Sequence, residues 1–67
     1  MSIILNKKFY KLSAVKKTIS AYRDLGSFKI KKRVKNYMVI LDEINSEAKE
    51  TIEDEFSNYV LATMKNE

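Results

Sequence analysis

The sequence predicts a small α+β domain with the element order β-α-β-β-α. Two stretches have apolar residues at helical spacing, Ala14–Leu25 and the region from Ser46 to about Met64. Between them, residues 28–33 alternate apolar and basic side chains, and Tyr37–Leu41 is apolar on both faces, as strands are. A chain of 67 residues has room for one such unit, so residues 1–67 are expected to form a single domain.

The first strand and first helix follow from local signals near the start of the chain. Ser2–Leu5 contains a β-branched pair and is expected to be a short strand, followed by a turn at 6–8. Ser13 is expected to cap the helix, because its hydroxyl can accept a hydrogen bond from a first-turn amide. The apolar face of the helix is expected to contain Leu12, Val15, Ile19 and Tyr22. Gly26, the single glycine, is expected to end the helix in a left-handed conformation.

The second and third strands are predicted to be joined by a tight connection at 33–36, with Asn36 as a turn residue. Alternation places one set of side chains inside and a basic set outside. The inward set is Phe28, Ile30 and Lys32, and the outward set is Lys29, Lys31 and Arg33.

The second helix has the clearest pattern in the chain. Ser46 is expected to cap it, and Glu47 and Glu50 suit the positive end of its dipole. Its apolar stripe is expected to contain Ala48, Ile52, Phe56, Tyr59, Val60 and Met64.

These elements predict a three-stranded antiparallel sheet in the order 1-3-2. A right-handed split β-α-β unit places the doubly apolar third strand in the middle and both helices on one face. This is a ferredoxin-like plan lacking the last strand, so the first strand becomes an open edge near Ile3–Leu5, where another chain can dock. The uncovered face is expected to show Ile4, then either Met38 and Ile40 or Tyr37 and Val39.

Charge is sorted along the chain. Residues 1–41 contain eleven Lys/Arg and one acid, a balance of +10, and residues 42–67 contain eight acids and two lysines, a balance of −6. A domain with such poles offers a basic surface to an acidic partner, an acidic surface to a basic one, or both.

Several classes of chemistry are disfavoured by composition. The chain has no histidine and no cysteine, so the usual general base, thiol nucleophile and Cys/His metal sites are absent. One glycine cannot build a phosphate-binding loop. Three consecutive acids at 53–55 point about 100° apart on a helix and do not converge. We therefore expect no catalytic residue, no metal and no cofactor.

The location expected from the sequence is the cytoplasm. The longest aliphatic run, Met38–Leu41, is far shorter than the roughly 20 residues that span a bilayer. The first residues, 1–5, lack the basic region and the apolar length of a signal peptide. No membrane partner is expected.

The simplest interpretation of the basic strand is a solvated basic face, and two kinds of partner are the alternatives. Residues 29–35 combine five Lys/Arg with apolar side chains, and an exposed Tyr37 beside them would be able to stack a base while the lysines neutralise phosphates. The same surface would also suit an acidic protein or peptide. The acidic second helix would repel a phosphate backbone, which favours the second alternative.

The chain also resembles a known family. The resemblance rests on Phe9-Tyr10, on the helix Ser13–Asp24, on strands centred at 28–30 and 38–41, and on Glu55–Leu61, which contains a Phe-centred motif close to E-F-x-N-x-[LV]. These features resemble the HxsD-like family of small proteins, which occur with radical SAM peptide-modifying enzymes and a precursor peptide. The matching positions on the helices are Tyr22, Asp24, Glu55, Phe56 and Asn58.

The resemblance implies a non-enzymatic accessory module in the radical SAM-dependent modification of a ribosomally made peptide, with the precursor peptide or the maturase as partner. The alternatives are a small nucleic-acid-binding protein that uses the basic strand and a structural homodimer. The residues expected to bind the partner are Ile4, Lys29, Lys31, Arg33, Met38, Glu55 and Asn58.

Overall fold

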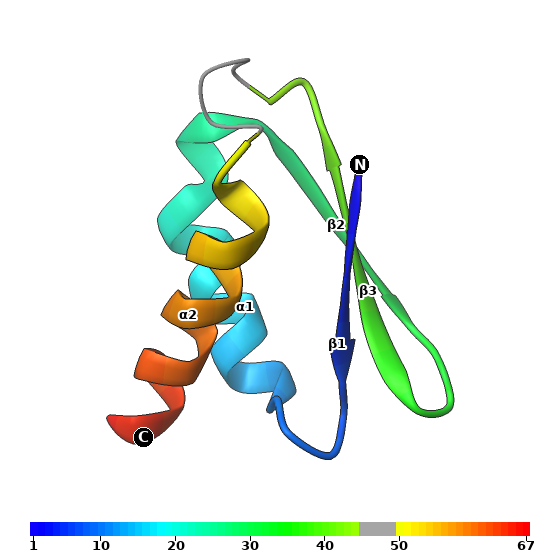
Figure 1. Cartoon of the computed structure of the whole chain (residues 1–67), viewed down its shortest axis with the longest axis vertical. Helices are drawn as coiled ribbons and strands as arrows, with labels where there is room; N and C mark the ends of the chain where they lie inside the picture. Colours follow the sequence, from blue (N-terminus) through cyan, green and yellow to red (C-terminus); the bar gives the residue numbers. More distant parts are fainter. Residues whose placement is uncertain (45–49) are drawn as a thin grey trace.

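A computed structural model describes residues 1–44 and 50–67 of the chain. It contains a three-stranded antiparallel sheet in the order β1-β3-β2, with two helices packed on one face (Figure 1). The strands are β1 (Ser2–Asn6), β2 (Ser27–Lys32) and β3 (Asn36–Asp42). The helices are α1 (Leu12–Tyr22), which continues into a 3₁₀ turn (Arg23–Leu25), and α2 (Ile52–Lys65). The predicted fold class, strand order and helix layer are confirmed.

The strand register decides which side chains face the helices. Val39 pairs with Ile3 of β1 and with Ile30 of β2. Residues directly opposite in antiparallel strands share a face, so this row projects toward the helices. Burial agrees, because Ile3, Val39 and Leu41 are at most 2% exposed.

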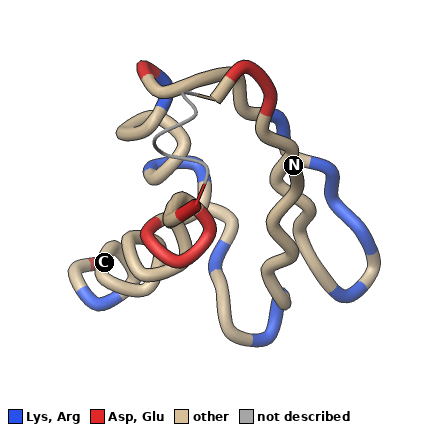
Figure 2. The backbone as a smooth tube through the Cα atoms, turned by 45° about the horizontal axis from the view of Figure 1, so that its top comes forward, with Lys and Arg blue, Asp and Glu red and all other residues tan. Residues whose placement is uncertain are grey.

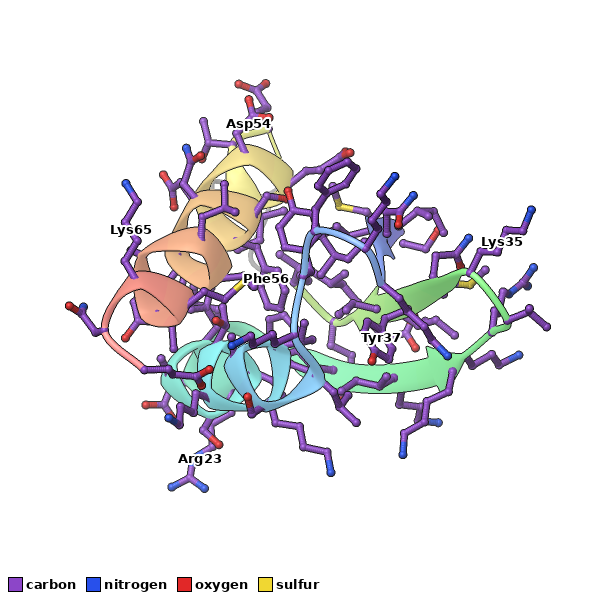
Figure 3. All side chains as sticks on the ribbon, turned by 90° about the horizontal axis from the view of Figure 1, so that it is seen from below. Arg23, Lys35, Tyr37, Asp54, Phe56 and Lys65 are labelled. Atoms are coloured by element: carbon purple, nitrogen blue, oxygen red, sulfur yellow. The ribbon has the colours of Figure 1, made fainter. Side chains whose placement is uncertain are left out.

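The core lies between the sheet and the helices, and Phe56 of α2 is at its centre (Figure 3). The Phe56 ring stacks on Phe28 of β2 with 5.8 Å between centroids and meets Tyr22 of α1 edge-on at 5.7 Å. Such aromatic pairs stabilise a core beyond the area that they bury. The fully buried residues of α2 are Ile52, Phe56 and Val60, as its spacing predicts. Tyr59 was expected in this stripe but is 43% exposed and packs edge-on against Tyr22 at the rim.

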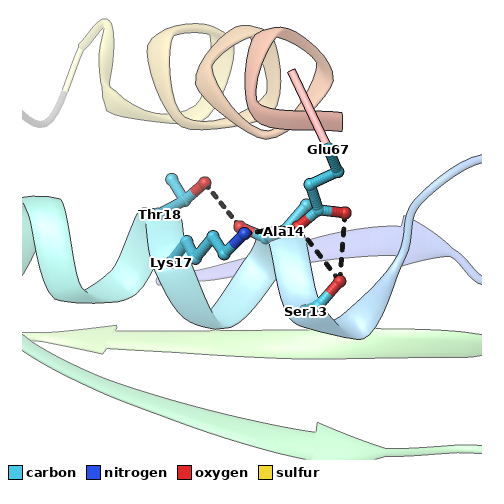
Figure 4. Close-up of polar contacts among 5 residues, drawn as sticks. All are labelled: Ser13, Ala14, Lys17, Thr18 and Glu67. Atoms are coloured by element: carbon cyan, nitrogen blue, oxygen red, sulfur yellow. Dashed lines mark hydrogen bonds and ion pairs between the residues drawn. The ribbon is translucent and has the colours of Figure 1, made fainter. Parts of the chain in front are cut away.

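The start of α1 differs from the prediction. Ser13 lies inside the helix, and Lys11 occupies the N-cap position without a side-chain hydrogen bond. The Ser13 hydroxyl donates instead to the Glu67 carboxylate at 3.1 Å, and Lys17 pairs with the same carboxylate at 3.1 Å (Figure 4). The hydroxyl therefore links the first turn of α1 to the end of α2.

The buried face of α1 is centred differently from the predicted one. Ala14, Val15 and Thr18 are fully buried, whereas Ile19 and Tyr22 are only partly covered. Thr18 is tolerated there because its hydroxyl donates to the Ala14 carbonyl at 2.8 Å (Figure 4).

Gly26 does not adopt the predicted left-handed conformation. Its φ of 164° and ψ of −170° describe extended backbone. The position is tight instead: a Cβ atom there would lie 2.9 Å from the Asp42 carbonyl oxygen and 3.1 Å from Cγ1 of Ile44. Glycine is used here for close approach of the chain to the end of β3.

The β2–β3 connection and the start of the second helix were also predicted. Asn36 is the first residue of β3 and not a turn residue, and the connection between β2 and β3 consists of residues 33–35. The expected cap Ser46, the acid Glu47 and the stripe residue Ala48 lie outside the described residues. The predicted helix start is wrong, because α2 begins at Ile52 with Thr51 as its N-cap, and Glu50 precedes the helix.

Candidate binding surface

The sheet face opposite the helices carries a continuous row of apolar and basic side chains. Ile4, Met38 and Lys31 lie side by side across the three strands, and Ser2, Ile40 and Lys29 form the next row. We call this surface the open face. It consists of Ser2, Ile4, Asn6, Ser27, Lys29, Lys31, Asn36, Met38, Ile40 and Asp42. The register thus resolves the two predicted alternatives, because Met38 and Ile40 face outward while Tyr37 and Val39 face the helices.

The open face is apolar at its centre and basic along β2. Ile4 is 53% exposed, and Met38 and Ile40 are half-buried although neither helix lies on this side of the sheet (Figure 1). Lys29 and Lys31 are exposed beside them. Four of the seven residues predicted to bind a partner, Ile4, Met38, Lys29 and Lys31, therefore lie together on one surface.

Arg33 lies at the end of this surface. It follows β2 in the hairpin connection, where its backbone N–H donates to the Asn36 carbonyl at 2.9 Å. Lys and Arg residues mark the β2–β3 hairpin, while acids mark the end of β3 and the first turn of α2 (Figure 2). The charge sorting in the sequence therefore becomes a basic hairpin, further basic residues between β1 and the end of the 3₁₀ turn, and two acidic segments.

Tyr37 does not take the position that base stacking would need. It is half-buried on the helix side of the sheet, and the ammonium of Lys7 lies 5.1 Å from its ring centroid. None of the ten open-face residues is aromatic. The open face consequently offers lysines and aliphatic side chains, but no aromatic platform for a base.

Glu55 and Asn58 lie on the other layer of the molecule. Both are exposed on α2, so the structure does not bring them together with the residues of the open face. Glu55 instead acts on Tyr22. Burial is the main cause that raises the pKa of the Tyr22 hydroxyl, and the negative charge of Glu55 raises it further. The neutral phenol is thereby favoured at the rim of the aromatic cluster.

The free edge of β1 is a second surface with binding capacity. Leu41 N–H donates to the Met1 carbonyl at 2.8 Å, and Lys7 N–H donates to the Lys35 carbonyl at 3.0 Å. Hydrogen-bonded pairs alternate along an antiparallel ladder, so the backbone groups of Ser2, Ile4 and Asn6 point away from β3, toward the edge. The predicted open edge is present, and the register identifies its free groups.

A hollow of about 300 Å³ lies at the opposite end of the sheet from the hairpin. Its walls are Met1, Leu41, Asp42, Glu43 and Ile44. It does not include any of the seven predicted binding residues. Within 1–44 and 50–67, no three acidic, His or Cys side chains converge as a metal site would require. None of the described helices is long and apolar enough to cross a membrane.

The fold therefore defines a small α+β domain with an open-faced, three-stranded antiparallel sheet. Comparisons with protein-family models, with curated proteins and with solved structures found no match.

The sequence left open whether Ile40 faces outward, and it did not identify which backbone groups of β1 point toward the edge. Ile40 was one of two alternatives, because five consecutive apolar residues give no alternation to read. The lysines of β2 decide which residues of β3 face outward. Lys29 and Lys31 must face solvent, and the strand pairing places Ile40 and Met38 opposite them, on the same face.

Proposed function

We propose that this chain is a non-enzymatic module that binds an acidic, extended peptide or protein segment on its open face. The observation that carries the proposal is the row formed by Ile4, Met38 and Lys31, continued by Ile40 and Lys29. Exposed apolar side chains rimmed by polar groups mark interaction sites on soluble domains.

The chemistry of the surface selects the partner. Its apolar centre would bury leucine- or valine-like side chains, and its two lysines would pair with carboxylates at the β2 side. An extended segment fits because its side chains alternate with the same period as the strands beneath it.

The resemblance to the HxsD-like family supports a more specific form of the proposal. In that form the bound segment belongs to a ribosomally made precursor peptide, or to the radical SAM maturase that modifies it, and this chain brings the two together. The cytoplasmic location expected from the sequence belongs to this form, because it places the chain beside a newly made peptide. A radical SAM enzyme encoded next to this chain would support it, and its absence would leave only the general binding module.

The test uses a synthetic peptide with a Leu-Thr-Glu-Thr repeat, which puts leucine and glutamate on the same face of an extended chain, with a Leu-Thr-Lys-Thr peptide as control, and measures binding by fluorescence anisotropy. The variant Lys29→Glu plus Lys31→Glu should bind the acidic peptide about tenfold more weakly or worse, because each reversal replaces an attraction by a repulsion. The matched control is Lys16→Glu plus Arg23→Glu, the same charge change at exposed sites of the helix layer.

Two outcomes would count against the proposal. Equal affinity of the two double variants would remove the open face as the binding surface. Tight binding of an oligonucleotide, with affinity falling steeply as salt rises, would favour the nucleic-acid alternative instead. That alternative has the basic hairpin in its favour, but lacks an aromatic side chain on the open face.

A further inference from the structure

We propose that two copies of this chain join through antiparallel pairing of their β1 strands, about a two-fold axis at Ile4, to give one continuous six-stranded sheet. This inference goes beyond the proposed function and does not depend on it, because it concerns the edge of the sheet and not the open face. It rests on the backbone register, the charges along each edge and the charges at the two ends of β1.

The free backbone groups of β1 are self-complementary. Pairing Ile4 with Ile4 of the second copy places Ser2 opposite Asn6, and both of these residues point toward the edge. The carbonyl of Asn6 is already used, since it accepts from Phe9 and Tyr10 N–H at 3.0 Å each. Four hydrogen bonds then form: two between the Ile4 residues, and one from each Asn6 N–H to the Ser2 carbonyl of the other copy.

The two edges of the sheet differ in protection. β2 carries Lys29, Lys31 and Lys32, and lysines on an edge strand are a common device against pairing. β1 has the sequence SIILN, with no charge and no proline. Its buried residues Ile3 and Leu5 pack into the core, so the unprotected edge belongs to a strand that the core holds in place.

Opposite charges meet when the pairing is antiparallel. The C-terminal end of β1 carries three cations, Lys7, Lys8 and the neighbouring Lys35. At the other end, Asp42 and Glu43 carry two negative charges, which are partly offset by the Met1 ammonium, and this register places that ammonium opposite Lys7 of the second copy. Antiparallel pairing places Asp42 and Glu43 about two strand spacings, or ~10 Å, from Lys7 and Lys8 of the second copy, and about three spacings from its Lys35. Parallel pairing would place like ends together.

Stacking of two open faces is the other way in which copies could associate, and charge opposes it. That arrangement would press the lysines of β2, Lys29 and Lys31, from both copies over one apolar patch and desolvate them together. Edge pairing leaves these lysines in solvent. It also keeps both open faces on the same side, because paired residues share a face. The central row then continues through Ile4 of both copies, with a lysine at each outer margin.

The primary test replaces Ile4 by proline. Since Ile4 N–H points away from β3, Ile4→Pro removes an edge donor without breaking the β1–β3 ladder. Sedimentation equilibrium is expected to show a dimer for the wild type and for the control Ile4→Val, which keeps the N–H, and a monomer for Ile4→Pro. Circular dichroism of Ile4→Pro establishes that the variant is folded.

A charge exchange keeps the test decisive if the proline variant unfolds. Lys8→Glu and Asp42→Lys each place like charges together in a dimer of their own kind, so each alone should dimerise about three- to tenfold more weakly at low salt. An equimolar mixture of the two restores every attraction and should dimerise at about the wild-type concentration. Lys16→Glu, on the helix layer, should leave dimerisation unchanged.

Three results would overturn the inference. The first is a wild-type protein that stays monomeric up to millimolar concentration. The second is a folded Ile4→Pro that dimerises like the wild type. The third is a mixture of Lys8→Glu and Asp42→Lys that associates no better than either variant alone.

Discussion

Neighbouring residues of β3 provide a matched test of which sheet face is covered. Leu41 and Ile40 have the same number of side-chain carbons, but Leu41 is 2% exposed against the helices and Ile40 is half-buried on the open face. We expect Leu41→Ala to leave a cavity and to lower the free energy of unfolding by about 3 kcal/mol. Ile40→Ala removes a side chain that water already reaches and should cost about 1 kcal/mol, mostly through lost β propensity.

These losses are large enough to separate by experiment. For a domain of this size the whole free energy of unfolding is roughly 3–10 kcal/mol. At about 4–8 °C per kcal/mol, Leu41→Ala should lower the melting temperature by ~12–24 °C and Ile40→Ala by ~4–8 °C. Urea and thermal denaturation, each followed by circular dichroism at low protein concentration, measure the free energies of unfolding and the melting temperatures of the two variants. Equal losses would refute the account, because they would mean that something covers the open face in solution.

Two further predictions concern the rim of the core. Gly26→Ala should lower the free energy of unfolding by about 1–3 kcal/mol, because its Cβ would meet backbone 2.9 Å away, and an unchanged urea midpoint would contradict that close approach. Glu55→Gln should lower the pKa of Tyr22 toward its ordinary value, read from the tyrosine ring carbon in an NMR titration, whereas the control Glu53→Gln should not. Folding raises the pKa of Tyr22, so the neutral phenol stabilises the folded state below pH 10. This stabilisation is lost as the pH rises through the pKa that Tyr22 has in the folded protein. Glu55→Gln should therefore make the free energy of unfolding fall less at alkaline pH.

The topology could be predicted because each element carries its own local signal. The apolar stripe of α2 and the alternation of β2 identify these elements, and the doubly apolar β3 could only be the central strand. Together with the right-handed crossover, these observations determine the strand order and the helix layer.

The errors at the ends of α1 arose from partners distant in sequence. Ser13 has the identity of a cap, but a carboxylate 54 residues further on accepts its hydrogen bond. Gly26 follows the helix, where glycine is common, but it is needed because its backbone lies close to the end of β3. Neither partner can be found from local sequence.

The candidate surface was predicted in part for a related reason. Alternation alone placed Lys29, Lys31 and Ile4 on the outer face. Which residues of β3 face outward could be decided only from the pairing register. Glu55 was included by family resemblance, which correctly placed it on the last helix, but that helix packs on the side of the sheet away from the open face.

The proposed binding of an acidic segment to the open face can be tested directly. The test is an NMR titration of the isotopically labelled protein with the Leu-Thr-Glu-Thr peptide, read out at backbone amides and methyl groups. We expect the largest shifts at the open-face residues Ile4, Met38, Ile40, Lys29 and Lys31, with α2 unaffected. Shifts concentrated at Glu55 and Asn58, or no shifts even at the highest soluble peptide concentration, would contradict binding at the open face.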